Sequence, residues 1–215
     1  MMDKKINFKS LIIRLLISLT GFVFSEFGIG CYYGCGLGTD PISVFVDGIH
    51  QASGLTYGQI STICNVILFV LIFLFERKHL GISTLIGTII AGPLIDFFET
   101  MIRTNFPVET TPIEIKILIL LAGLITTGIG AGLCIVCKMG IGNFQFIPLF
   151  LADHTNLDLK YCQMLSDASF FIVGLLLGGV VGIGTVVGVL FTGYVLDWTI
   201  RKMEKYVDGL GPIFS

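Results

Sequence analysis

Long apolar segments alternate with short polar ones along this chain. A membrane-spanning helix needs about 20 mostly apolar residues. Six segments meet this requirement approximately: 11–33, 57–75, 80–102, 116–137, 160–179 and 182–200. Two other apolar stretches, 41–52 and 144–153, are too short to span and are predicted as short helices. The pattern predicts an all-α integral membrane protein with six transmembrane helices and no soluble domain.

The composition agrees with this class. Of the 215 residues, 54% are hydrophobic and 13% are charged, whereas soluble domains carry about 25% charged residues. The net charge of −2 gives no reason to expect nucleic acid as a partner. The lipid bilayer is the first partner to expect.

All six cysteines lie in or beside apolar segments. Cysteine in such a setting acts as a small hydrophobic residue. A redox role for the pairs Cys31/Cys35 and Cys134/Cys137 is the alternative. A zinc site would need a second Cys or His pair nearby, so we expect no metal and no cofactor.

Basic residues predict the orientation, because cytoplasmic loops are enriched in Lys and Arg. With six spans and the N-terminus inside, only Arg103 and Lys116 of the 13 basic residues fall outside. Removing one span destroys this asymmetry. We therefore expect a multi-pass protein with both termini in the cytoplasm.

The two halves of the chain resemble each other. At an offset of 104, Gly28, Gly36 and Gly38 align with Gly132, Gly140 and Gly142. At an offset of 101, six of the 16 positions in 81–96 are identical to those in 182–197. Repeat 1 covers about 11–103 and repeat 2 about 115–203, within a single membrane domain. Three spans per repeat give the repeats opposite orientations, as in many secondary transporters, although a duplication without a transport role remains open.

Glycine pairs interrupt the apolar pattern in both repeats. Gly36 and Gly38 allow the first span to end. Thr39 or Asp40 can then cap a helix over 41–52, with Pro41 at its first position. Gly140 and Gly142 do the same in repeat 2, where Asn143 is the expected cap of a helix over 144–153. Each short helix is either re-entrant or lies flat at the interface. Asp40 is expected on the outer side, in contact with water.

Polar residues inside the apolar segments are the candidate binding residues. Intramembrane carboxylates such as Glu26 and Asp167 are functional candidates by default, and helix starts favour anions. Hydrogen bonding between helices is the alternative role for the amides. The small-residue stripes in 81–91 and 182–192 predict that these two helices form the seam between the repeats. The expected substrate or ion pathway comprises Glu26, Asp40, Gln59, Asn65, Asn143, Gln145, Gln163 and Asp167.

The segment Gly36–Pro41, Gln59 and the Ile-Gly-Thr run at 86–88 resemble the YczE/YyaS/YitT family of bacterial membrane proteins. The resemblance covers about residues 10–200 and is closer to the shorter YczE-type members, since the chain stops soon after Lys205. It implies a location in the bacterial inner membrane. It implies no activity for particular residues.

The sequence favours a transporter for a small solute, with proton or cation coupling as an option. One alternative is an accessory protein that binds a membrane protein partner or forms a homodimer. Another is a substrate-binding subunit of a larger transporter. An enzyme is not expected, because the only histidines are His50, His79 and His154 and they form no workable set with nucleophiles or acids. A transporter predicts a polar cavity between the repeats, lined by Glu26 or Asp167.

Overall fold

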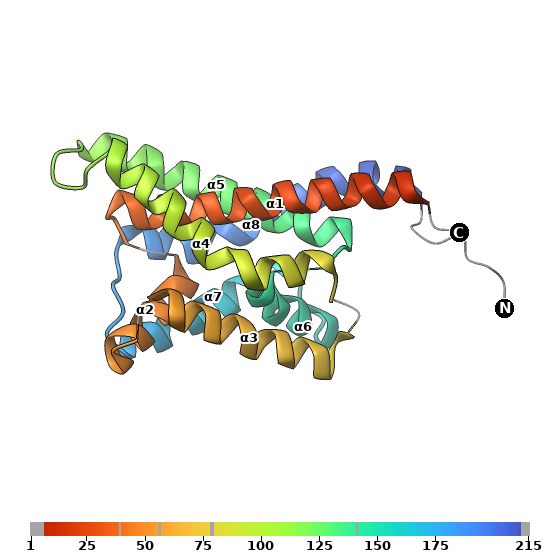
Figure 1. The fold of residues 1–215 in the computed structure, drawn as a ribbon, viewed down its shortest axis with the longest axis horizontal. Coiled ribbons are helices and arrows are strands. Elements are labelled where there is room, and N and C mark those ends of the chain that lie inside the picture. The colour runs from red at the N-terminus through yellow and green to blue at the C-terminus, as the bar shows by residue number, and fades with distance from the viewer. Residues whose placement is uncertain (1–6, 39, 56, 78–79, 141, 212–215) are drawn as a thin grey trace.

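The computed structural model describes residues 7–38, 40–55, 57–77, 80–140 and 142–211, which are helical apart from their connections (Figure 1). The element bounds are α1 Phe8–Cys35, α2 Pro41–Ser53, α3 Tyr57–Phe75, α4 Ile82–Asn105, α5 Ile113–Cys137, the 3₁₀ helix η2 Asn143–Gln145, α6 Phe146–His154, α7 Leu159–Leu176 and α8 Ile183–Gly209. Both short helices expected from the sequence are present, as α2 and α6.

Four helices are long and apolar enough to cross a membrane: α1, α4 from Thr84, α5 and α8. The described part of α3 from Gln59 is apolar but shorter. Helix α7 has 18 residues, and Gln163 and Asp167 reduce its apolar character. The chain is therefore a helical membrane protein with four candidate spans among the described residues.

The long helices α1, α4, α5 and α8 run side by side in one layer, and α2, α3, α6 and α7 lie beneath it (Figure 1). Within the upper layer α1 packs against α5 and α4, and α8 packs against α5. The predicted seam between the segments now described as α4 and α8 is therefore wrong. The main seam lies between α1 and α5, which form the most extensive helix–helix contact among the described elements.

Glycines bring the backbones of α1 and α5 together. A Cβ atom on Gly130 would lie 2.4 Å from both Gly21 O and Ser25 N. A Cβ atom on Gly28 would lie 2.6 Å from Gly123 O. Any larger residue would force the two backbones apart, and small residues are the usual device for close helix packing in lipid.

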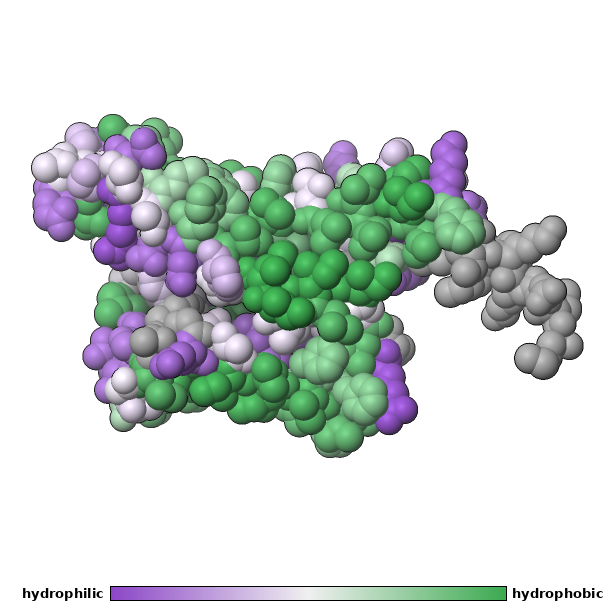
Figure 2. Space-filling model, viewed as in Figure 1, coloured by the Kyte–Doolittle hydropathy of each residue, from purple (hydrophilic) through white to green (hydrophobic). Residues whose placement is uncertain are grey.

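Apolar side chains cover much of the outside. Leu176 is 80% exposed, Ile183 70% and Ile89 69%. Figure 2 shows the apolar residues over the middle of the visible face, with hydrophilic residues gathered toward its two ends. A continuous apolar surface of this kind is stable in contact with acyl chains, which agrees with a membrane protein.

Arg14 fixes the end of the molecule where α1 begins. Its side chain is buried, and it donates to Val207 O at 2.8 Å and to Cys137 O at 3.4 Å. These carbonyls belong to the last turns of α8 and α5, where the usual i+4 donors are missing; Val207 O also accepts from Leu210 N at 3.2 Å. Arg14 thereby holds the start of α1 beside the ends of both helices.

The helix breaks use left-handed backbone at three of the four predicted glycines. Gly36 ends α1 with φ 68°, and Gly38 and Gly140 have φ 109° and 110°. Gly142 has φ −62°, so its backbone does not require glycine. The residue that ends α5 is Lys138, with φ 55°.

Candidate functional site

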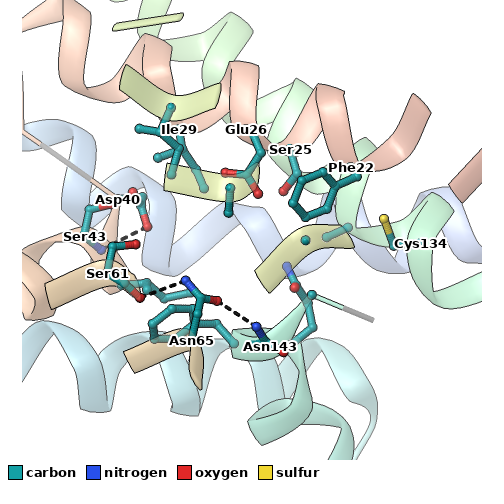
Figure 3. Close-up of a pocket in the computed structure, with 18 of the residues that line it drawn as sticks. Phe22, Ser25, Glu26, Ile29, Asp40, Ser43, Ser61, Asn65, Cys134 and Asn143 are labelled. Atoms are coloured by element: carbon teal, nitrogen blue, oxygen red, sulfur yellow. Dashed lines mark hydrogen bonds between the residues drawn. The ribbon is translucent and has the colours of Figure 1, made fainter. Parts of the chain in front are cut away.

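A polar cavity lies between elements of both halves of the chain (Figure 3). It has about 70 Å³ of room for the centres of water-sized molecules, enough for about five waters. Its polar lining residues come from α1, the start of α2, α3, and the segment around η2: Ser25, Glu26, Asp40, Ser43, Ser61, Asn65, Asn143 and Gln145. We call it the central cavity.

Two carboxylates line the central cavity. Glu26 and Asp40 are each 6% exposed. Among the described residues, Glu26 Oε2 and Asp40 Oδ1 have no hydrogen-bond partner. Buried polar atoms without partners are costly, so these two oxygens are available to a ligand.

Asp40, one of the two predicted caps, caps α2; the other, Thr39, lies outside the described residues. Its Oδ2 accepts from Ser43 N at 3.2 Å, and Pro41 occupies the first helical position. The expected position in contact with water is wrong, since Asp40 is buried. The start of α2 is enclosed between other elements, and its own side chain already supplies the negative charge that a helix N-terminus favours.

The amides of Asn65 and Asn143 meet across the cavity wall. Asn143 Nδ2 donates to Asn65 Oδ1 and to Thr88 Oγ1, both at 2.9 Å. Asn65 Nδ2 donates to Ser61 O at 2.9 Å. The predicted capping role of Asn143 is wrong: it is the first residue of η2, and its side chain reaches toward α3 and α4. Its Oδ1 has no partner among the described residues.

A second cavity adjoins the first and shares Ser25, Asp40 and Gln145 with it. Asp167 lines this second cavity and accepts a hydrogen bond from Gln163 Nε2 at 2.8 Å. Tyr32, Thr127 and Thr192 complete its polar lining. Asp40 therefore lies between Glu26 on one side and Asp167 on the other.

The lining of both cavities is rich in acceptors. The residues described along them include three carboxylates and no Lys, Arg or His. The described part of the chain also holds no group of three or more His, Cys, Asp or Glu residues arranged for a metal ion. The cavities can accept hydrogen bonds and positive charge, but they offer no basic group to an anion.

Seven of the eight predicted pathway residues line these two cavities: Glu26, Asp40, Asn65, Asn143, Gln145, Gln163 and Asp167. Gln59 does not. It is exposed in a surface groove with Thr62, Pro93 and Asp96. Gln59 and Asn65, which were both predicted to face the pathway, are divided, because only Asn65 faces the interior.

Several hydroxyl groups at the site were not predicted. Ser61 lines the central cavity one turn before Asn65, and this four-residue spacing was a signal that could have identified it. Ser25 precedes Glu26 and lines both cavities. Thr88 and Tyr32 come from other helices, and no local pattern connects them to the acids.

Comparisons with known proteins place the chain among bacterial membrane proteins. A family of unknown function, DUF6198, matches residues 12–201. The uncharacterized membrane protein YczE of Bacillus subtilis is 24% identical over 93% of this chain and 91% of its own length. The uncharacterized protein YyaS of the same organism is 24% identical, over 86% and 92%. An uncharacterized protein of Haemophilus influenzae is 26% identical, over 88% and 85%. No solved structure matches.

Proposed function

The chain belongs to the DUF6198 family, and from that premise we propose that it is a membrane transporter for a small solute. The central cavity carries the proposal. Buried acids line it within a largely apolar wall, and residues 22–65 and 131–145 both contribute to it. Buried ionisable groups within membrane segments are costly and are typically retained on substrate or ion pathways.

Paired contacts between the halves support an inverted repeat. Gly21 lies against Gly130, and Gly28 lies against Gly123. At an offset of 102, Gly21 corresponds to Gly123 and Gly28 to Gly130, so each contact is the counterpart of the other. Such reciprocal contacts are expected across a pseudo-twofold axis.

The glycine breaks are related in the same way. Gly38 lies against Gly182 at the start of α8, and Gly140 lies against Gly81 at the start of α4. Gly38 corresponds to Gly140 at an offset of 102, and Gly81 corresponds to Gly182 at an offset of 101, so the two contacts are counterparts. We therefore revise the offset between the first helices of the two repeats from 104 to 102. The reason is that α1 and α5 end at left-handed residues, Gly36 and Lys138, which are 102 positions apart.

In this proposal α3 and α7 complete a set of six spans. The short helices α2 and α6 are re-entrant, and they bring Asp40 and Asn143 to membrane depth beside the cavity. Non-helical backbone at that depth is tolerated where it is buried in protein or lines a cavity. The transporter hypothesis requires a cavity lined by Glu26 or Asp167. Both residues line cavities here, which favours transport over an accessory protein with a tightly packed interface.

A ligand screen followed by a flux assay tests the proposal. The purified protein is heated in the presence of small anions, neutral solutes and cations, and a ligand of the folded state raises Tm. The solute that binds should enter proteoliposomes, with flux reduced at least about tenfold in Glu26→Gln. Glu204→Gln, an exposed change on α8, is the matched control. A protein that binds no solute class and moves none across the bilayer is not a transporter.

A further inference from the structure

Three acceptor atoms line the central cavity without a hydrogen-bond partner among the described residues. They are Glu26 Oε2, Asp40 Oδ1 and Asn143 Oδ1. Asn143 is only 3% exposed, and its amide nitrogen is already used by Asn65 and Thr88. Because Asn143 donates both of these hydrogen bonds from its amide nitrogen, its carbonyl oxygen is left without a partner among the described residues.

The groups that line the central cavity determine which charge a bound ligand can carry. Two buried acids without a basic neighbour in the cavity lining need either protons or a cation. An anion would face both acids, and the helix start that could attract it is already capped by Asp40. A metal ion lacks a sufficient set of ligands in the described residues.

The rest of the wall is apolar and aromatic. Phe22, Ile29, Ile95 and Phe144 line the central cavity beside the polar groups. Such side chains suit a hydrocarbon body, and aromatic rings also attract cations. A hydrated inorganic ion would leave these side chains without a partner.

An acidic depression lies on the surface beside the second cavity, although one of its acids, Glu99, is paired with Arg103 at 2.9 Å. It is lined by Asp47, Asp96, Glu99, His50 and Arg103, and its volume is about 320 Å³. Tyr32, only 1% exposed, contributes to this depression and to the second cavity. A surface field of this sign concentrates cations near the depression.

We propose that the solute is a small organic cation, a primary ammonium group on a short apolar body. This rests on the proposed function and specifies its substrate class. The ammonium group supplies three N–H donors to the three free acceptors, and the apolar body lies against the aromatic and aliphatic wall.

Butylammonium chloride is the probe, and butyrate and butanol match its size with negative and zero charge. Tm of the purified full-length protein is measured in amine-free phosphate buffer at constant ionic strength. Butylammonium should raise Tm by about 3 °C at saturation, while butyrate and butanol should not. The rise should disappear in Glu26→Gln and Asp40→Asn and persist in the exposed controls Glu204→Gln and Asp208→Asn.

A labelling experiment on the unsubstituted protein guards against variants that fail to fold. A hydrophobic carbodiimide modifies buried carboxyl groups, and peptide mass spectrometry measures the modified fraction at Glu26. Butylammonium should reduce that fraction at least about fivefold, as expected for a site near saturation, while tetramethylammonium, which has no N–H donor, should protect less.

The two proposals fail in different ways. If butyrate or butanol binds and protects Glu26 while butylammonium does not, the substrate class is wrong and a solute site remains. If butylammonium neither raises Tm nor protects Glu26, the ammonium site is rejected. Transport itself is rejected only when the broader solute screen and the flux assay are also negative.

Discussion

At the scale of single residues, the site is held by amide groups that bond across helices. Asn143 donates to Asn65 and to Thr88, which joins η2, α3 and α4. Hydrogen bonds between membrane helices are individually weak, at about 0.6 kcal/mol on average. Their effect here is positional, because they orient the free Asn143 carbonyl oxygen.

A double-mutant cycle measures this connection. Asn143→Ala and Asn65→Ala should each lower the free energy of unfolding in detergent, and the double variant should lose less than the sum. We expect a coupling of about 0.5–1.5 kcal/mol, because both single changes remove the same hydrogen bond.

The control cycle pairs Asn65→Ala with Asn105→Ala. Asn105 is exposed at the end of α4 and donates to Met101 O on its own helix. The losses in unfolding free energy caused by these two changes should add. Additivity in the Asn65/Asn143 cycle as well would show that the amide contact does not contribute to the stability of the site.

At the scale of helices, the fold depends on the contact between α1 and α5. The apolar effect that drives helices together in water is absent among acyl chains, so close packing has to supply the attraction. Glycine supplies it at Gly21, Gly28, Gly123 and Gly130.

Gly130→Ala tests this contact. Its new methyl group would lie 2.4 Å from backbone atoms of α1, so the helices must separate. We expect a loss of about 1–3 kcal/mol in the free energy of unfolding, typical of overpacking, measured by denaturant titration of the purified protein.

Gly92→Ala is the matched control, since a Cβ atom at Gly92 in α4 meets nothing within 4 Å. Alanine there should be neutral or stabilising by up to about 1 kcal/mol, because it favours helix over glycine. Equal losses at both positions would indicate a general effect of glycine replacement and would contradict the packing argument.

At the scale of the whole molecule, the two ends of the bundle differ in charge. The start of α1 and the end of α8 lie at one end, joined through Ser10 Oγ to Gly211 O at 3.0 Å. The loop between α4 and α5 lies at the other end (Figure 1). Arg103 and Lys116, the two basic residues predicted outside, flank that loop.

Cysteine labelling of intact cells tests this orientation. Glu109→Cys in the α4–α5 loop should react with a membrane-impermeant maleimide added outside. Glu204→Cys near the end of α8 should react only after the cells are permeabilised. The unsubstituted chain, whose described cysteines are buried or half-buried, measures the background. Labelling of both positions from the same side would contradict the predicted topology.

Local signals in the sequence were sufficient for the class of fold and for much of the site. Apolar length predicted the four candidate spans, and the Asp40-Pro41 pair predicted the start of α2. Isolated polar residues in apolar segments predicted seven of the residues that line the cavities. Burying a polar group or ending a helix in an apolar environment demands particular residues locally. The role of the seven residues as a solute or ion pathway stays a prediction.

Tertiary packing decided the remainder. The sequence pattern assigned the main seam to the helices now described as α4 and α8, but the most extensive helix contact is between α1 and α5. Gln59 and Asn65 share a helix, yet only Asn65 faces the cavity, and Asn143 bonds across to α3 where a helix cap was expected. Such choices depend on which neighbour offers a partner or a close fit in space, and spacing along one helix does not contain that information.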